Sequence, residues 1–193
     1  PGLSGSLKGE GGLRGNLAQP QIQGNLQGSQ VGYKDLKIAK LSLQANQVGA
    51  QYDLRGTIEG LRQGNNQIQQ AEFSLQGQLA RHTLSLKVVH QAGKLEGRAS
   101  GSWNGQQWHG AIESLALRDT AAGNWQLTNP VAVTASAQAF SLVNACLVNP
   151  QNARICSKAD WGSQRGLTAS GVLQQVPMSL ARAFLPATLQ LPG

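Results

Sequence analysis

Apolar and polar residues alternate along most of this chain with a period of two, which is the pattern of β-strands. The clearest unit is five residues long: an apolar residue, any residue, glycine, any residue, an apolar residue. The apolar pair and the glycine share one face of the strand, and the intervening polar residues share the other. Copies of this unit occupy residues 3–7, 13–17, 22–26, 54–58, 75–79, 95–99 and 169–173.

The repeated glycine predicts the shape of the sheet. Glycine inside a strand weakens it and often marks a bend or a close approach. Glycines on the same face of many strands leave that face without bulk along its midline, so the sheet can curl there. We therefore expect an all-β fold: a long curved antiparallel sheet, or open half-barrel, with an apolar concave side and a polar, glutamine-rich convex side.

Turn signals between the strands indicate an antiparallel meander with a strand about every ten residues. Plain alternating strands are expected at residues 41–45 and 82–88. Asn104-Gly105 predicts a two-residue hairpin, and the glycine-rich residues 9–15 predict another turn. Residues 125–127 and 131–135 are expected to pair around Asn129-Pro130.

The C-terminal part predicts one short helix, at about residues 177–185. It would begin at Pro177 and stop before Pro186, with Leu180, Phe184 and Leu185 on one face. Leu189 then resembles the start of another strand.

The 193 residues suit one repetitive β unit. The chain starts at Pro1 and shows no signal-peptide pattern, and the strand pattern looks cut off near Leu189. We expect residues 1–193 to be a single fragment of a longer protein. No apolar run approaches the roughly 20 residues of a membrane-spanning helix.

The net charge of +7 comes from basic residues that are scattered singly rather than clustered. Nucleic-acid binding proteins usually gather such charge into a patch or stripe, so we expect no nucleic-acid partner. A mildly basic solvated face is the simpler reading, and attraction to an anionic lipid surface is the alternative.

Two cysteines, Cys146 and Cys156, lie symmetrically about the turn sequence of residues 149–152. A hairpin there would place them opposite each other. The resulting disulfide would contribute roughly 2–3 kcal/mol and indicate an oxidising compartment. The alternative is a pair of buried free thiols.

No catalytic, metal-binding or cofactor motif is recognisable, and we expect no enzymatic activity and no cofactor. His82, His90 and His109 have no nearby carboxylate in sequence, and the acidic residues are dispersed. The four tryptophans lie near strand ends, where packing is the usual explanation and a position at a lipid–water boundary is the alternative.

The order of several loose motifs resembles a known family. The glycine strands are followed by Trp108-His109-Gly110, the Cys146–Cys156 hairpin, the strand of residues 166–171 and the proline-bounded helix. Together they resemble the middle-to-late periplasmic region of the TamB family, within the AsmA-like group of bacterial envelope proteins.

The resemblance implies a U-shaped β-taco in the periplasm of a Gram-negative bacterium, in a parent protein anchored in the inner membrane. It implies carriage of phospholipid towards the outer membrane, together with assistance to the assembly of nascent outer-membrane proteins. The implied partner is the outer-membrane barrel TamA, contacted through the parent protein rather than through these residues.

A lipid-lining role is expected for the shared apolar face of the repeats. The alternatives are a dry core, a structural β-solenoid, a closed sheet around one small ligand, and a chaperone that captures strands by edge pairing. The candidate lining residues are Leu13, Leu17, Ile22, Leu26, Leu41, Leu43, Leu54, Ile58, Leu75, Leu79, Leu84, Leu86 and Val88.

Overall fold

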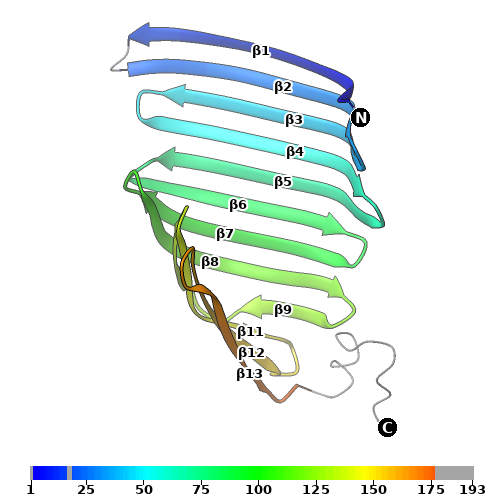
Figure 1. Cartoon of the computed structure of the whole chain (residues 1–193), viewed down its shortest axis with the longest axis vertical. Helices are drawn as coiled ribbons and strands as arrows, with labels where there is room; N and C mark the ends of the chain where they lie inside the picture. The colour runs from blue at the N-terminus through cyan, green and yellow to red at the C-terminus, as the bar shows by residue number, and fades with distance from the viewer. Residues whose placement is uncertain (1, 17–18, 177–193) are drawn as a thin grey trace.

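The computed structural model describes residues 2–16 and 19–176, and within them the chain forms one antiparallel sheet of thirteen strands (Figure 1). The alternating sequence pattern accounts for most of the strands, because it places most of the apolar residues of a strand on one face. The strands are β1 Ser4–Asn16, β2 Gln19–Tyr33, β3 Leu36–Val48, β4 Gln51–Gln63, β5 Asn66–Gln78, β6 Arg81–His90, β7 Gly93–Trp103, β8 Gln107–Thr120, β9 Gly123–Leu127, β10 Val131–Ser136, β11 Ala139–Val148, β12 Arg154–Gly162 and β13 Gly166–Gln174.

Neighbours in the sheet are almost always neighbours in the sequence. The order runs from β1 to β8, then β10 to β13, and β9 pairs with β8 and β11 beside this path. Every pairing within the described residues is antiparallel. This topology is the predicted meander. It differs from the parallel coils of a β-helix, and β1 and β13 lie at opposite edges of the sheet.

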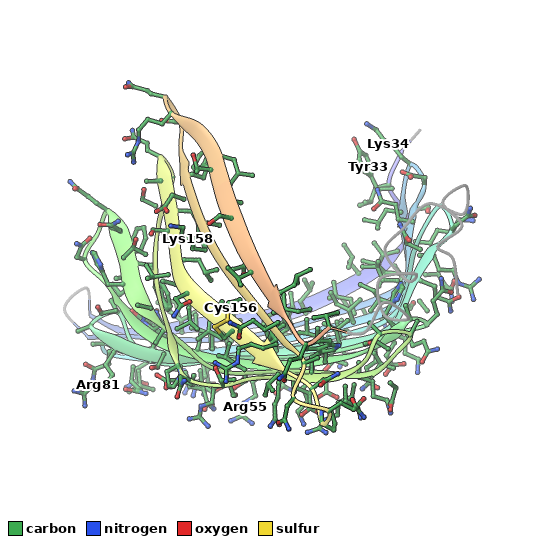
Figure 2. The ribbon with its side chains drawn as sticks, turned by 90° about the horizontal axis from the view of Figure 1, so that it is seen from below. Tyr33, Lys34, Arg55, Arg81, Cys156 and Lys158 are labelled. Carbon is green, nitrogen blue, oxygen red and sulfur yellow. A yellow bond between two sulfur atoms is a disulfide. The ribbon has the colours of Figure 1, made fainter. Side chains whose placement is uncertain are left out.

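The sheet is strongly curved. Figure 2 shows the ribbon as a U, with the side chains of Arg55 and Arg81 on its convex side. Arg55 belongs to the polar set of alternating residues, opposite Gln44 and Ser74 on the adjoining strands. The apolar set of the same strands therefore faces the concave side. The prediction of an all-β, curved antiparallel sheet is confirmed.

One predicted pairing is wrong: β9 and β10 do not form a hairpin. Both lie between β8 and β11, so they are two parts of one interrupted strand. The backbone N–H of Thr128 donates to the carbonyl of Cys146 at 3.0 Å, which holds the chain alongside β11. Pro130 has no N–H to donate, so it interrupts the ladder there without reversing the chain.

A second expectation is wrong at the N-terminus. The glycine-rich residues 9–15 form no turn, because they lie inside β1, where Gly11 is opposite Gly24. A paired neighbour supplies the ladder that the glycines alone disfavour. Several N-terminal strands are consequently 13–15 residues long, rather than one strand in every ten residues.

The hairpin between β7 and β8 is confirmed, with a shift of one residue. Trp103 is opposite Trp108, and Asn104 donates from its backbone to the carbonyl of Gln107 at 3.2 Å. The two central residues are therefore Gly105 and Gln106. Gly105 has a φ of 98°, a region that favours glycine.

The well-buried residues gather near the C-terminal strands. The buried apolar residues of the described part are Ala122, Trp125, Val131, Val133, Cys146 and Ala153, and none of its large side chains is completely buried. The expected helix at 177–185 and the strand expected at Leu189 lie outside the described residues. Within the described part, no helix is long and apolar enough to cross a membrane.

Candidate functional site: the apolar face of the sheet

The apolar face consists of three rows of residues that run across the strands. Residues directly opposite on neighbouring strands lie on the same face, so the register defines each row. Row one is Leu7, Gly28, Leu41, Ile58, Ala71, Val88, Leu95, Leu117 and Trp125; row two is Gly9, Leu26, Leu43, Gly56, Phe73, Leu86, Gly97 and Leu115; row three is Gly11, Gly24, Ala45, Leu54, Leu75, Leu84, Ala99, Ile112 and Val131.

Nearly all of the predicted lining residues belong to this face. Leu13 and Ile22 lie opposite each other one step beyond row three. Leu79 lies in the turn after β5, where its carbonyl accepts a hydrogen bond from the N–H of Trp103 at 2.7 Å. Leu17 lies outside the described residues. The three rows bring together Leu26, Leu41, Leu43, Leu54, Ile58, Leu75, Leu84, Leu86 and Val88.

Sequence reasoning missed other members of the same rows. Phe73, Leu115 and Leu117 all lie on this face. They were missed because neither strand contains an apolar-x-Gly-x-apolar unit at those positions. The plain alternation of apolar and polar residues through β5 and β8 is the signal that would have found them.

The apolar face remains accessible. Leu13 is 74% exposed, Leu84 43% and Leu86 39%. The other predicted lining residues of the strands, with the exception of the 40% exposed Ile22, are half-buried. Within the described residues, no second layer of strands lies over this face.

Two glycines of the apolar face, Gly56 of the repeat and Gly28 outside it, make room for large side chains on neighbouring strands. A Cβ atom at Gly56 would collide with the ring of Phe73, directly opposite, and would lie 2.8 Å from Cδ2 of Leu43. At Gly28 it would lie 2.9 Å from Cδ2 of Leu7. At these two positions, bulky side chains of the neighbouring strands fill the space that the missing Cβ atom leaves.

One polar pair lies on this face. The indole N–H of Trp108 donates to Nε2 of His82 at 2.7 Å, and His82 is only 8% exposed. Because Nε2 accepts, the proton is on Nδ1, which donates to the carbonyl of Gln78 at 3.1 Å. The indole ring covers the opposed glycines Gly101 and Gly110, where any Cβ atom would collide with it.

The opposite face is polar and carries the ion pairs. Arg55 donates to both carboxylate oxygens of Asp53, at 2.9 and 2.8 Å, and Gln76 donates to the same group at 3.1 Å. The hydrogen bond from Arg55 is the main reason that the pKa of the Asp53 carboxyl lies below its ordinary value. Lys94 likewise lowers the pKa of Asp119 across a 2.8 Å ion pair.

The predicted disulfide is present and joins β11 to β12. Cys146 lies directly opposite Cys156. The turn between the two strands is held by Asn149, which is 6% exposed and whose Oδ1 accepts from the N–H groups of Gln151 and Ala153 at 3.0 and 2.8 Å. Ala159 continues the apolar face, because it lies opposite Leu142, which lies opposite Val133 of β10. Cys156 points to the other face of β12, so the disulfide does not interrupt the apolar face.

The described residues contain no group of three or more His, Cys, Asp or Glu side chains that could hold a metal ion. Ser85, for which the sequence predicts the convex side, lies opposite Ser74 and Arg98 in the polar set. Leu86 and Ser85, which are consecutive in β6, therefore lie on opposite faces of the sheet.

These features define a class: a long, open, antiparallel β-sheet whose concave face is apolar and accessible. Comparison with protein families gives a more specific result, because the family model described as "TamB, N-terminal domain" matches residues 1–193. The chain belongs to the TamB family, which consists of bacterial envelope proteins. The matched domain is the N-terminal one, whereas the motifs had pointed to a middle-to-late region. No solved structure matches the chain.

Proposed function

We propose that this chain is a segment of a periplasmic bridge between the inner and outer membranes. In this proposal its apolar face binds the acyl chains of phospholipids by non-covalent contact while the headgroups stay in water. No chemical step is involved, so the segment has no enzymatic activity. Assistance to outer-membrane protein assembly, and contact with TamA, would belong to the parent protein.

The observation that carries the proposal is the accessible apolar face. Monomeric soluble proteins rarely expose contiguous apolar patches larger than a few hundred Å². An uncovered patch on the order of 1,000 Å² would forgo roughly 25 kcal/mol at about 25 cal/mol per Å², which exceeds the stability of a typical domain. An apolar ligand that runs along the three rows offsets this cost, and a flexible acyl chain fits their shallow, continuous shape.

Photocrosslinking in living cells tests the proposal directly. A crosslinking residue at Leu86 is expected to become attached to phospholipid, because this side chain is 39% exposed on the apolar face. The same residue at Ser85, on the opposite face of the same strand, is the matched control and should stay free of lipid. Absence of lipid at both positions would argue for a dry face covered by protein.

The second candidate is capture of an extended strand by edge pairing, and the exposure of β13 favours it. Every residue of β13 is exposed, and among the described residues only β12 pairs with it. An unpaired edge offers backbone donors and acceptors to another strand. A charge on the apolar face, such as Leu86→Glu, should weaken lipid binding and leave edge pairing intact.

Proline substitutions in β13 make the reverse test. In an antiparallel pair, successive residues point their N–H groups alternately to the partner and to the free edge. Of Thr168→Pro and Ala169→Pro, one therefore removes a donor from the free edge and the other breaks the ladder with β12. If β13 captures strands, the variant that keeps the ladder should lose capture while retaining both its fold and its lipid crosslinks.

A further inference from the structure

A hollow of about 540 Å³ lies where β2, β3 and β4 approach the turn that follows Tyr33. Its lining includes three basic residues, Lys34, Lys37 and Arg62, and neither Asp nor Glu. Figure 2 shows Tyr33 and Lys34 at the upper end of one arm of the U, away from Arg55 and Arg81. The hollow is thus at the margin of the sheet.

Two of these cations face each other without a counter-charge. Lys37 lies directly opposite Arg62, and the next residues in the same cross-strand row are Gly32 and Gln67. Like charges directly opposite on antiparallel strands destabilise the pairing. The ion pairs of the described residues use Lys40, Arg55 and Lys94, so within that part of the chain no carboxylate forms an ion pair with Lys37 or Arg62.

The nearest carboxylates along the chain do not neutralise the positive charge of Lys37 and Arg62. Glu59 pairs with Lys40 at 3.1 Å. Asp35, in the turn, is outside the lining of the hollow and makes no ion pair in the described part of the chain. The site therefore keeps an excess of positive charge.

Glycine and backbone geometry keep the hollow open. Gly60 has a φ of 63°, and a Cβ atom there would lie 2.8 Å from Cβ of Ala39. A Cβ atom at Gly32 would lie 2.6 Å from Oγ of Ser4. The turn fixes one of the cations, since Nζ of Lys34 lies 5.3 Å from the centre of the Tyr33 ring.

We propose that this hollow binds a phosphate-type oxyanion, either free or as the headgroup phosphate of a lipid. Guanidinium and ammonium groups donate strong charge-assisted hydrogen bonds to phosphate oxygens, and arginine can do so with two parallel bonds. A bound dianion would convert the Lys37–Arg62 repulsion into two attractions. The lipid form rests on the proposed function, whereas the oxyanion site itself does not.

The hollow adjoins the apolar face through two residues of its lining. Val31 and Ile38 line the same hollow. Cγ2 of Val31 lies 3.0 Å from the position of a Cβ atom at Gly28, which is a member of row one. Lys37 is the chain neighbour of Ile38, so Lys37 and the opposed Arg62 point to the other face of the sheet. A lipid whose phosphate is held there would have to pass around the margin of the sheet to place its acyl chains on row one.

Calorimetric titration with inorganic phosphate and with sn-glycerol 3-phosphate tests the oxyanion site, because neither probe has an acyl chain. Removing both facing charges, in Lys37→Gln/Arg62→Gln, should weaken binding by about tenfold or more. The double variant Arg98→Gln/Lys158→Gln removes the same charge from exposed positions outside the hollow and should bind as the unaltered chain does. Failure of the unaltered chain to bind either probe, or equal weakening in both double variants, would overturn the proposal.

Two further measurements complete the test. Phosphate should raise the Tm of the unaltered chain but not that of Lys37→Gln/Arg62→Gln, because a ligand stabilises only a state that binds it. The unaltered chain and Lys37→Gln/Arg62→Gln are then compared for binding to phosphatidylglycerol vesicles. If the unaltered chain binds them and the variant does not, the lipid headgroup is the source of the oxyanion. Binding of the soluble probes without such vesicle binding would identify a free anion, and the oxyanion site would stand even if the acyl-chain proposal failed.

Discussion

At the scale of single residues, the central glycines of the repeat differ in what they do, and Gly56 leaves space for a specific neighbour. Gly56 faces Phe73 across the β4–β5 ladder, and the ring occupies the space above it. Gly24 belongs to the same kind of unit, but a Cβ atom there would meet its nearest neighbour, the carbonyl oxygen of Glu10, only at 3.8 Å. Two glycines of one motif thus differ in what an added methyl group would meet.

Gly56→Ala should therefore lower the free energy of unfolding by about 1–3 kcal/mol, because the ring of Phe73 must move. Gly24→Ala should be neutral or slightly stabilising, because alanine restricts the unfolded chain more than glycine does. Urea unfolding of both variants provides the comparison. Equal effects would show that the gap at Gly56 is not needed for packing.

Trp108→Phe tests the polar pair on the apolar face. The variant keeps an aromatic ring over Gly101 and Gly110 but leaves Nε2 of the buried His82 without a donor. The expected loss is about 1–3 kcal/mol in the free energy of unfolding. In the double variant Trp108→Phe/His82→Leu, most of this loss should disappear, and an unchanged loss would attribute it to the smaller ring instead.

Single residues also mark the limit of the sequence analysis. Periodicity correctly placed on one face the apolar residues singled out in β1 to β6, and the symmetric spacing of Cys146 and Cys156 correctly predicted their pairing. The glycine-rich residues 9–15 were assigned to a turn because a turn and a paired glycine strand have similar local sequences. Only the partner strand, which places Gly24 opposite Gly11, distinguishes the two.

At the scale of elements, the dependence of a segment on a distant partner strand also explains why a hairpin of β9 and β10 was wrongly predicted. Asn129-Pro130 is a good turn sequence, but the bond from Thr128 to Cys146 depends on β11, which follows much later in the chain. The β11–β12 hairpin was easier to predict because its turn, its strands and its disulfide are all local.

That hairpin has two independent constraints, the disulfide and the turn held by Asn149. Replacing both cysteines, in Cys146→Ser/Cys156→Ser, should cost about 2–3 kcal/mol through the greater freedom of the unfolded chain. Reduction of the unaltered chain with dithiothreitol should cause the same shift in urea unfolding. The serine variant should not respond to dithiothreitol, and a response would reveal an effect unrelated to this bond.

At the scale of the whole molecule, ion pairs on the polar face give a weak dependence of stability on pH. The pKa of Asp53 is lowered below its ordinary value of 3.8, mainly by Arg55. The folded state thus gains stability from the ionised carboxylate above that value, and loses it as the pH falls through the lower folded pKa. The effect should be small because both side chains are well exposed.

Thermal unfolding between about pH 2 and pH 7 should therefore show a Tm that falls below about pH 4. Asp53→Asn should flatten part of that decline while leaving the Tm at low pH nearly unchanged. A decline as steep in the variant as in the unaltered chain would assign the acid sensitivity to other carboxylates.

The sequential order of the strands has a consequence for the length of the molecule. A strand that touches only its predecessor and its successor can be joined by a further hairpin without rerouting any other part of the chain. Each added hairpin extends the sheet by about 10 Å, twice the spacing between strands, and prolongs the three rows by two positions. The length of such a sheet is thus counted in hairpins, and a longer or shorter sheet needs only a change in their number.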